Sequence, residues 1–404
     1  MRLSAITSVP LVIALAACSG AMNSLPVGNS APEPGQNLAN ASRLPSAAEL
    51  GLWPRAGQAE RVCADAPRGY AHCLALVRTD IAGLVRRNTP NGYSPDDLQT
   101  AYALTSYSSS NGKGQTVAIV DAYADPNAAK DLAIYRSQYG LSSCTVSNGC
   151  FATKAFGSSS NAGWAEEESL DVDMVSAICP NCHIILVEAA SSSLSALATA
   201  EKYATQHAHY VSNSWSGDEG TKTYDGDFNV SGVAITAATG DSGYNSTAQW
   251  PAILSTVTAV GGTTLSSYSP RAESAWSGAG SGCSKIYAKP SFQSGLSTGC
   301  SGRAEADTSA DADPNTGVAV YDSYRESGWL VFGGTSVATP IIASTFALAG
   351  TTADNNDSHL YSNAASLNDI TSGSNGSCGK PLCTSGTGWD GPTGLGTPNG
   401  IAAF

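Results

Sequence analysis

The sequence predicts an α/β fold with a doubly wound, mainly parallel β-sheet and helices on both of its faces. Two observations predict it. From about residue 93, strand-like and helix-like segments alternate along the chain, and the strand segments are nearly continuous apolar runs. A strand that is apolar on both faces is typical of a parallel sheet covered on both sides by helices. The chain has 404 residues, which is enough to bury a large core.

The first strand is expected at residues 116–121 (TVAIVD), after a Gly-rich turn, and the helix that follows it at residues 127–139. The remaining elements follow in chain order: an apolar helical pattern at 174–178, a strand at 183–188, an Ala-rich helix at 193–206 and strands at 210–214, 233–239 and 257–264. Functional groups in such sheets gather where strands end. Asp121, Trp215 and Asp241 lie at or just past such ends.

Residues 1–17 have the pattern of a signal peptide. Arg2 precedes an apolar run at residues 6–15, which is too short to span a bilayer. The run ends in Leu-Ala-Ala-Cys18, which resembles the lipobox of bacterial lipoproteins, in which Cys18 would be acylated; ordinary signal-peptidase cleavage nearby is the alternative. We expect an exported protein, either secreted or held at the bacterial cell envelope (outer membrane or cell surface) by a lipid on Cys18.

Three further regions follow the signal segment. Residues 18–60 are rich in Ala, Ser, Asn, Pro and Gly without apolar periodicity, and we expect them to form a disordered tether. Residues 61–92 are a short extension with one cysteine pair, and residues 93–404 are the main domain.

The chain has eleven cysteines, and without Cys18 an even set of ten remains, as expected for an exported protein. They lie in close pairs, and pairing between neighbours is a hypothesis because sequence does not determine connectivity: Cys63/Cys73, Cys144/Cys150, Cys179/Cys182, Cys283/Cys300 and Cys378/Cys383. Cys-Pro-Asn-Cys at residues 179–182 is either a redox motif or a structural loop. Its place between a helical pattern and a strand favours the loop.

Charge excludes one class of partner. Only 13% of residues are charged and the net charge is −13, so nothing in the chain neutralises nucleic-acid phosphates. A sparsely charged, acidic surface would suit acidic surroundings.

Ser336 is a candidate nucleophile without a histidine base. It lies in Gly-Thr-Ser-Val-Ala-Thr-Pro (residues 334–340), before a small apolar run at 341–348 that predicts a buried helix. The N-terminus of a helix favours developing negative charge. None of the five histidines lies in a segment typical of a catalytic base, so either Ser336 has no function or another group takes its proton.

Glu167 and Asp171 are candidates for that role. They are four residues apart, so on a helix their Cβ atoms would lie ~5–6 Å apart on one face. Two carboxyl groups this close can share a proton and act as a base and its orienting partner. The alternative is an acidic first turn that complements the helix dipole.

Asp241 is a third candidate acid. It follows the strand at 233–239 in the tight turn Gly-Asp-Ser-Gly. A carboxylic acid donates a hydrogen bond to an oxyanion only while it is protonated, which favours low pH. The alternative is an aspartate that caps its own turn.

Seven motifs in a common order resemble the sedolisin family, the serine-carboxyl peptidases with a subtilisin-like fold. The resemblance covers residues from about 92 to 404. The motifs are EESLD (167–171), SNSWS (212–216), ATGDSGY (238–244), TAVGGTTL (258–265), ADPNTG (312–317), GGTSVATP (333–340) and GWDGPTGLGTP (388–398).

The resemblance implies that Ser336 is the nucleophile, Glu167 the general base, Asp171 its partner and Asp241 the oxyanion acid. The protein would then be an endopeptidase that cleaves protein or peptide substrates through an acyl-enzyme, and we expect a monomer. Below about pH 6 a histidine base is mostly protonated, whereas a glutamate with a pKa near ~4 to 5 still accepts a proton.

Three more residues acquire possible roles from the resemblance. Asp121 stands where the family often has a glutamate, and it is either an auxiliary acid or a plain strand-end aspartate. Ser214 and Trp215 either line the substrate cleft or, in the case of Trp215, belong to the core.

The C-terminal region resembles the family's calcium loop. The resemblance implies one structural Ca²⁺ ion, with these ligands besides water: Asp369, the carbonyls of Ile370, Gly386 and Gly388, and Asp390. Carboxylates and carbonyls on Gly-rich turns suit a cation that takes ~6 or more oxygens. The alternative is a turn whose aspartates cap backbone N–H groups.

Two rival functions stay open at this point. One is an inactive, protease-like lipoprotein that binds peptide, glycan or a partner protein. The other is a subtilisin-type enzyme whose base is His183.

The chain also lacks room for the family's long folded propeptide, so processing near residues 86–91 and inhibition by the extension are open questions.

Overall fold

The computed structural model describes residues 57–81, 90–220, 222–245, 247–351, 357–379 and 381–404, which all belong to one compact unit, Leu44–Phe404. The predicted signal segment, Cys18, most of the predicted tether and residues 86–89 lie outside the described residues. Within those ranges, no helix has both the length and the apolar character needed to cross a membrane.

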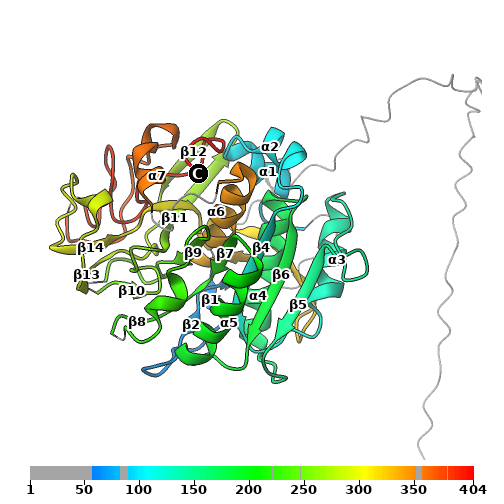
Figure 1. Cartoon of the computed structure of the whole chain (residues 1–404). Coiled ribbons are helices and arrows are strands. Elements are labelled where there is room, and N and C mark those ends of the chain that lie inside the picture. Colours follow the sequence, from blue (N-terminus) through cyan, green and yellow to red (C-terminus); the bar gives the residue numbers. More distant parts are fainter. Residues whose placement is uncertain (1–56, 82–89, 221, 246, 352–356, 380) are drawn as a thin grey trace, which may run out of the picture. The chain divides into compact units, whose positions relative to one another are not determined.

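A central eight-stranded sheet confirms the predicted fold class (Figure 1). Its strands are β4 (Thr116–Ala122), β5 (Phe151–Ala155), β6 (His183–Ala189), β7 (Tyr210–Asn213), β9 (Ala234–Ala238), β11 (Thr258–Tyr268), β12 (Arg271–Ala275) and β15 (Thr308–Asp311). They follow the order β12-β11-β9-β7-β4-β6-β5, with β15 on β11. Every pairing is parallel except that of β11 with β12.

Helices cover both faces of this sheet. They are α1 (Pro95–Ala101), α2 (Thr105–Ser110), α3 (Ala128–Gln138), α4 (Ala162–Ile178), α5 (Leu194–His207), α6 (Thr335–Ala349) and α7 (Ser358–Ser362). Side chains of β4 alternate between two cores: Val117 and Ile119 pack on the side of α4 and α6, whereas Ala118 and Val120 pack on the side of α5. Strand β4 is therefore buried on both faces, which is why its sequence is a continuous apolar run.

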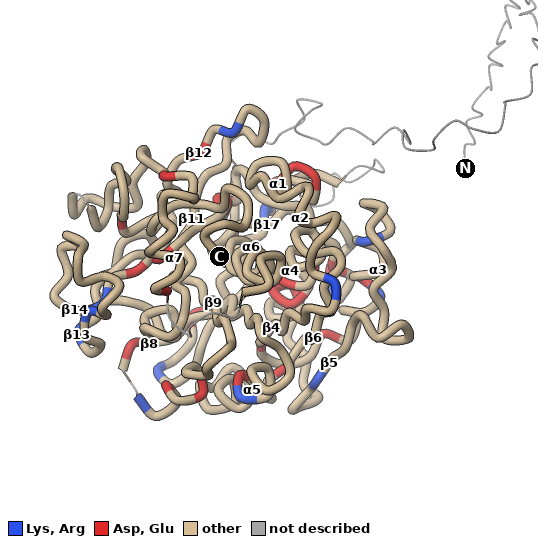
Figure 2. Tube along the Cα trace, turned by 45° about the horizontal axis from the view of Figure 1, so that its top comes forward, with Lys and Arg blue, Asp and Glu red and all other residues tan. Residues whose placement is uncertain are grey.

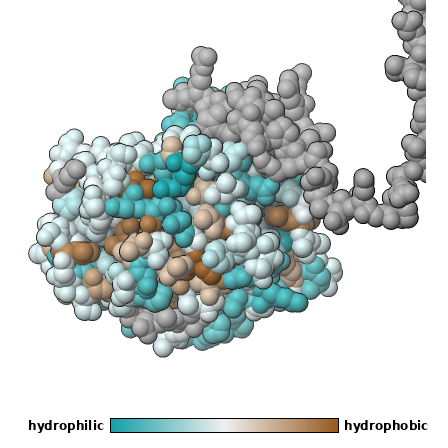
Figure 3. Space-filling view, turned by 90° about the horizontal axis from the view of Figure 1, so that it is seen from above, coloured by the Kyte–Doolittle hydropathy of each residue, from teal (hydrophilic) through white to brown (hydrophobic). Residues whose placement is uncertain are grey.

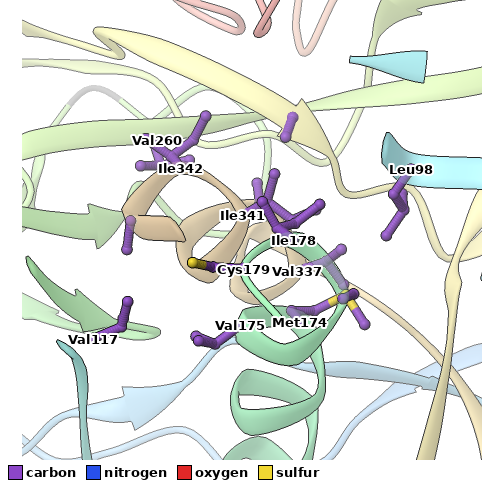
Figure 4. Packing of buried hydrophobic residues seen from close by; sticks show 14 of the residues in the cluster. Leu98, Val117, Met174, Val175, Ile178, Cys179, Val260, Val337, Ile341 and Ile342 are labelled. Carbon is purple, nitrogen blue, oxygen red and sulfur yellow. The ribbon is translucent and has the colours of Figure 1, made fainter. Parts of the chain in front are cut away.

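Apolar contacts fix α4 against α6. Figure 4 shows Met174, Val175 and Ile178 of α4 facing Val337 and Ile341 of α6, and all five side chains are fully buried. Because α4 carries Glu167 and α6 carries Ser336, this packing sets the distance between the two candidate residues.

Both helices begin at defined caps. The side chain of Asn161 accepts a hydrogen bond from the Trp164 N–H and starts α4. Gly334 precedes α6 with φ at 99°, a conformation that favours glycine. Helix α6 thus begins at Thr335, earlier than the apolar run from 341 implied, and Ser336 lies in its first turn. The predicted place of Ser336 at a helix N-terminus is confirmed.

The N-terminal segment, residues 57–81, adds strands to two of the smaller sheets of the unit. It contains β1 (Ala59–Arg61), β2 (His72–Cys73) and β3 (Leu76–Arg78). Strand β2 pairs with β8 (Trp215–Asp218), and β3 lies between β1 and β17 (Gly328–Gly333). In Figure 1 the blue strands β1 and β2 lie among β8, α4 and α5.

The other strands are β10 (Gln249–Trp250), β13 (Gly282–Ala288), β14 (Gly302–Glu305) and β16 (Val318–Asp322), and short 3-10 turns lie at Asp225–Phe228, Ser291–Gln293, Pro314–Thr316 and Ala364–Ser366. All five predicted neighbour pairs of cysteines form disulfides. The Cys179–Cys182 bond is buried directly after α4, where the structural-loop interpretation placed it. Figure 3 shows a surface of mostly pale, weakly polar residues, in keeping with the low charge content.

Candidate active site

The four predicted residues of the site lie on three elements; Glu167, Asp171 and Ser336 are fully buried, and Asp241 is half-buried. Glu167 and Asp171 project from α4, Ser336 from the first turn of α6, and Asp241 from the turn after β9. The first turn of α4 contains no acidic residue, so the helix-dipole alternative for Glu167 and Asp171 does not apply. In Figure 2 the acidic positions of α4 lie in the middle of the fold, whereas most Lys and Arg positions are scattered toward its periphery.

Glu167 contacts both the serine and the N-terminal segment. Its Oε2 accepts hydrogen bonds from the backbone N–H groups of Leu74 at 2.9 Å and Ala75 at 2.7 Å. Burial raises the pKa of Glu167 well above its usual range, with a further increase from Asp121, while a hydrogen bond with Ser336 acts in the opposite direction. Glu167 is therefore placed to exchange a proton with Ser336.

Asp171 is tied to Ser214. The Ser214 hydroxyl donates to Asp171 Oδ1 at 2.8 Å. Burial raises the pKa of Asp171 strongly, and the charges of Asp121 and Glu167 raise it further. Asp121 lies in the same environment, where burial and then the Glu188 carboxylate raise its pKa to about 8.

These three carboxyl groups form no salt bridge among the described residues. Carboxyl groups that are buried together without a cation cannot all be ionised near neutral pH, because the Coulomb repulsion and the lost hydration both oppose it. Glu167, Asp171 and Asp121 therefore share protons as a coupled set.

Asp241 has one oxygen in use and one free. Its Oδ1 accepts from the Thr335 N–H at 2.8 Å and from the Thr335 hydroxyl at 2.9 Å. Its Oδ2 is buried without a partner among the described residues. These bonds reach α6 rather than the turn of Asp241 itself, in contrast to the turn-capping alternative. Burial raises the pKa of Asp241 to about 7 against the lowering effect of Thr335. A proton on Oδ2 would leave Oδ1 free to accept both Thr335 donors.

Ser214 borders the site with both its hydroxyl and its carbonyl, whereas Trp215 borders it with its backbone. The Ser336 hydroxyl donates to the Ser214 carbonyl at 3.2 Å. The indole of Trp215 is fully buried against Phe228 and Trp250 and donates to the Val120 carbonyl at 2.8 Å, so the ring belongs to the core. Trp215 borders the site through its backbone, which pairs with the backbone of Cys73.

A cleft of about 210 Å³ opens beside Asp241. Its lining includes residues 239–243 and Glu305, together with Arg61, His72 and Leu74 of the N-terminal segment. We predicted no role in the site for this segment. Its partners are more than 90 positions away, and only the Cys63/Cys73 pair indicated a folded structure there.

The burial of carboxyl groups extends beyond the predicted residues. Both carboxylate oxygens of Glu168 are buried without a hydrogen-bond partner among the described residues, and burial raises its pKa strongly. Glu166 lies next to it with a pKa raised to about 8, first by burial and then by Glu326. The run of three glutamates was visible in the sequence, but nothing in it distinguished buried members from exposed ones.

His183 does not reach this site. It is the first residue of β6, exposed, and pairs with Thr116 at the start of β4. The site lies at the opposite, carboxyl ends of these parallel strands. The structure therefore argues against a subtilisin-type mechanism with His183 as the base.

The five residues of the expected calcium loop lie in one cluster of turns. The Gly388 N–H donates to Asp369 at 3.0 Å and the Gly386 N–H to Asp390 at 3.1 Å, as the capping alternative predicts. Burial raises the pKa of Asp390 to about 6. No group of three or more acidic, histidine or cysteine side chains is arranged around a common point in the described part of the chain. The donor set would have to include backbone carbonyls such as that of Ile370.

Comparisons with known proteins identify relatives of one kind. The chain is 29% identical over 354 residues to kumamolisin of Bacillus sp. (strain MN-32), covering 77% of this chain and 63% of kumamolisin. It is 35% identical over 169 residues to sedolisin of Pseudomonas sp. (strain 101), covering 37% of this chain and 28% of sedolisin. The chain thus spans less than two thirds of these relatives. None of the protein-family models matches it.

Solved structures agree with the sequence comparison. Pseudomonas sedolisin, a serine-carboxyl proteinase complexed with two molecules of pseudo-iodotyrostatin, superimposes with a TM-score of 0.64 and 25% identity over 77% of this chain and 96% of that one. A lanthipeptide protease shares the fold with a TM-score of 0.50 and 14% identity over 76% of this chain and 94% of that one.

Buried acids with raised pKa values make folding stability depend on pH. Glu201 of α5 is fully buried, and burial raises its pKa to about 8. The native state then binds more protons than the unfolded state between the ordinary carboxyl pKa of ~4.3 and about pH 8, so stability falls as pH rises across that window. We predict that Glu201→Gln reduces this fall by up to about 5 kcal/mol, because each pKa unit corresponds to ~1.4 kcal/mol.

The measurement is denaturant unfolding from pH 4 to 8 in a Ser336→Ala background, which removes the candidate nucleophile. Glu60→Gln, which changes an exposed glutamate of β1, is the matched control and should leave the pH dependence unchanged. Parallel curves for Glu201→Gln and its parent would contradict the prediction.

Proposed function

We propose, on the premise that this chain is a homologue of the sedolisin-family serine-carboxyl peptidases, that it is an endopeptidase that cleaves peptide bonds at acidic pH. One observation carries the proposal. Glu167 lies close enough to the Ser336 hydroxyl for that hydroxyl to lower its pKa, and its Oε2 accepts a hydrogen bond from the Ala75 N–H at 2.7 Å, while Asp241 brings a buried oxygen without a described partner to the same site.

The proposed reaction uses these groups in turn. Ser336 Oγ attacks the carbonyl carbon of the substrate and passes its proton to Glu167. Protonated Asp241 donates a hydrogen bond to the oxyanion from Oδ2. Glu167 then gives the proton to the departing nitrogen, and a water molecule repeats the sequence on the acyl-enzyme. Asp171 stabilises and orients Glu167, with Asp121 as an auxiliary acid in the coupled set.

The acid pH range follows from two opposite requirements. Asp241 has to keep its proton, which holds below its pKa of about 7. The set of Glu167, Asp171 and Asp121 has to carry at least one negative charge so that it can accept a proton from Ser336. Activity is therefore expected between the lowest apparent pKa of the coupled set and the pKa of Asp241.

Location and assembly belong to the same proposal. Five disulfides suit an exported protein, because such bonds persist outside the reducing cytosol. We propose export with a lipid anchor on Cys18, protein or peptide substrates outside the cell and a monomeric enzyme. No role for nucleic acid is included.

One structural Ca²⁺ ion completes the proposal. Two carboxylates and the carbonyls of Ile370, Gly386 and Gly388 are oxygen donors of the kind that Ca²⁺ prefers. A cation beside Asp390 would offset the burial that raises the pKa of this carboxyl. The ion would hold the C-terminal loops together and would take no part in the reaction.

Peptide cleavage tests the mechanism. We predict that purified protein cleaves a mixed peptide library with a rate that rises from pH 8 toward about pH 4, and that Ser336→Ala and Glu167→Gln each lower the rate by ~10³-fold or more. The readout is mass spectrometry of the products, and Glu326→Gln is the control for loss of a glutamate. An optimum near pH 8, or full activity in Glu167→Gln, would contradict the carboxylate base. Peptide binding without cleavage would favour the binding-protein alternative.

Asp241→Asn separates the oxyanion role from the base. Asparagine keeps an acceptor for Thr335 and carries an N–H donor at every pH, so the decline of kcat/KM above about pH 7 should weaken. Asp241→Ala lacks the donor and should lose ~10²–10³-fold at the optimum. The pH profile of kcat/KM is the measurement. An unchanged alkaline decline in Asp241→Asn would remove Asp241 from this role.

Chelation tests the calcium site. If Ca²⁺ is present at a hundred times its Kd, its removal costs ~2.7 kcal/mol and should lower the Tm by roughly 5 °C. Asp369→Asn should lower the Tm in Ca²⁺ and make it insensitive to chelator, whereas Asp96→Asn, an exposed residue of α1, should behave like the parent. A Tm that chelator leaves unchanged in the parent would contradict the site.

A further inference from the structure

The cleft beside Asp241 has a polar lining. Its volume is about 210 Å³. A water molecule needs only ~10–15 Å³ of such space, so the cleft has room for a long side chain. Leu74 is the only apolar side chain among the described residues that line it, although ligand pockets are usually lined mainly by apolar groups. The cleft is therefore suited to a side chain with a polar or charged end.

The charges along the cleft differ between its two parts. The N-terminal segment contributes both signs of charge, with Arg61 paired to Asp65 at 2.9 Å. No Lys, Arg or His from the described residues after 90 lines the cleft, whereas three acids do: Asp218, Asp241 and Glu305. Acidic walls make the potential in a cleft negative when they ionise. An anionic side chain is then repelled and a cationic one is attracted.

Glu305 is the most enclosed of these three acids. It is 1% exposed, whereas Asp241 is half-buried and Asp218 is exposed. Both carboxyl oxygens of Glu305 accept from one donor, the Gln249 N–H, at 3.1 and 3.2 Å. Glu305 forms no salt bridge in the described part of the chain. Its carboxylate can therefore accept further hydrogen bonds, because each oxygen has two lone-pair sites.

The cation nearest to Glu305 in the sequence already has a partner. Arg303 bonds to Asp307 with both Nη atoms, at 3.0 Å from Nη1 and 2.6 Å from Nη2. Its guanidinium is fully buried and also donates to the carbonyls of Ala252 and Val257. The charge of Arg303 is thus neutralised by Asp307 and not by Glu305.

Two other oxygen atoms of the lining have no hydrogen-bond partner among the described residues. They are Ser216 Oγ and Asp241 Oδ2, and both atoms are buried. A Lys ammonium has three donors and an Arg guanidinium has five, and neither has an acceptor. Such side chains match a lining that is rich in oxygen acceptors, whereas an aliphatic side chain would leave these oxygens unpaired.

The place of Asp241 decides which residue of a substrate reaches the cleft. Asp241 is the proposed donor to the carbonyl oxygen of the bond that is cut. The Cα of the same substrate residue is bonded directly to that carbonyl carbon. The side chain on the amino-terminal side of the cut is therefore the one that reaches a cleft lined by Asp241.

We propose that Glu305 is a specificity residue that selects Lys or Arg as the substrate residue whose carbonyl carbon Ser336 attacks. The inference rests on the proposed peptidase function and adds a substrate class to it. A bound ammonium or guanidinium group would neutralise a carboxylate that is enclosed without a cation of its own. Asp or Glu at the same position of the substrate is disfavoured by the acidic lining.

The preference should depend on pH. Burial raises the pKa of Glu305 well above its usual range, against the lowering effects of the Gln249 N–H and Arg303. Glu305 is therefore protonated at low pH and gains its charge as pH rises. A Lys side chain stays charged throughout, because its ordinary pKa is ~10.4. The advantage of Lys over an uncharged side chain should thus grow as pH rises from 4 to 6.

Other charges act on the same cleft. Asp307 and Glu219 raise the pKa of Glu305 further. The remaining ionisable residues of the lining are Arg61, Asp65, His72, Asp218 and Asp241. Ionisation of the acids and loss of a proton from His72 would also favour a cation as pH rises, so a change at Glu305 itself is needed to assign the effect.

A matched peptide series tests the preference. Peptides of one sequence carry Lys, Arg, norleucine, Gln or Glu at a single position, and mass spectrometry identifies the bond that is cut. We predict that kcat/KM for Lys exceeds that for norleucine, which lacks the charge, at least ~10-fold at pH 6 and by less at pH 4. Equal values at pH 6, a preference for Glu, or a preference carried by the residue after the cut would overturn the inference.

Glu305→Gln tests the residue. Glutamine keeps an acceptor for the Gln249 N–H but carries no charge, so the ratio of kcat/KM for Lys to that for norleucine should fall at least ~5-fold at pH 6. Asp218→Asn, which removes an exposed and better screened charge of the same lining, should lower the ratio less. Glu60→Gln, exposed and outside the lining, should keep the ratio of the parent.

Circular dichroism establishes that these variants are folded. An unchanged ratio in folded Glu305→Gln would overturn the assignment to Glu305. If Glu305→Gln does not fold, the parent decides, because a ratio that stays constant from pH 4 to 6 would also overturn it.

Binding to Ser336→Ala separates this inference from the peptidase function. Fluorescence anisotropy at pH 6 should show the labelled Lys peptide bound at least ~10-fold more tightly than the norleucine peptide. If the parent cleaves peptides and neither kcat/KM nor Kd distinguishes Lys from norleucine, the inference is overturned and the peptidase function stands. If Ser336→Ala shows the preference but neither the parent nor any other variant cleaves a peptide, the preference is supported and the peptidase function is overturned.

Discussion

The burial of carboxyl groups without cations is the constraint on which the site depends. Glu167, Asp171 and Asp121 are fully enclosed, and they form no salt bridge among the residues that the structure describes. In such surroundings a carboxyl group keeps its proton well above its ordinary pKa. The result is a set of acids beside Ser336 that keep protons above the pH at which an ordinary carboxyl group loses them.

The burial of carboxyl groups without cations affects the pH dependence of folding stability as well as the protonation of the candidate site. Every acid that folding encloses without a partner favours the protonated state and thus an acidic medium. Glu201 on α5, which has no predicted role in the reaction, has a raised pKa like Asp241 in the site. Carboxyl groups with raised pKa values are therefore not confined to the site, and the chain as a whole has a low content of charged residues.

The N-terminal segment forms part of the candidate site. Its backbone supplies donors to Glu167, and its strands continue two sheets of the unit on either side of Ser336. Arg61, His72 and Leu74 of this segment therefore form part of the lining of the cleft beside Asp241. Ser214 contacts Asp171 and Ser336, whereas the indole ring of Trp215 lies in the core.

The sequence alone determined the local features. Apolar runs such as residues 116–121 predicted the buried strands, the spacing of Glu167 and Asp171 placed both on one helix, and close cysteine pairs predicted the disulfides. These features depend on neighbours within a few positions, so a periodic pattern is enough to reveal them. The motif order also predicted which four residues would come together.

Only the tertiary structure decided what the acids and the N-terminal segment do. Whether Glu168 is exposed or enclosed, whether Trp215 turns to the cleft or the core, and where Leu74 lies all depend on contacts between segments distant in sequence. The shift in a carboxyl pKa comes from the hydration and charge around it, which exist only after those segments have packed. The serine and its acids could be predicted from the sequence because a motif marks each of them, but the contact of Glu167 with the backbone of Leu74 and Ala75 could not, because it joins segments that are distant in the chain.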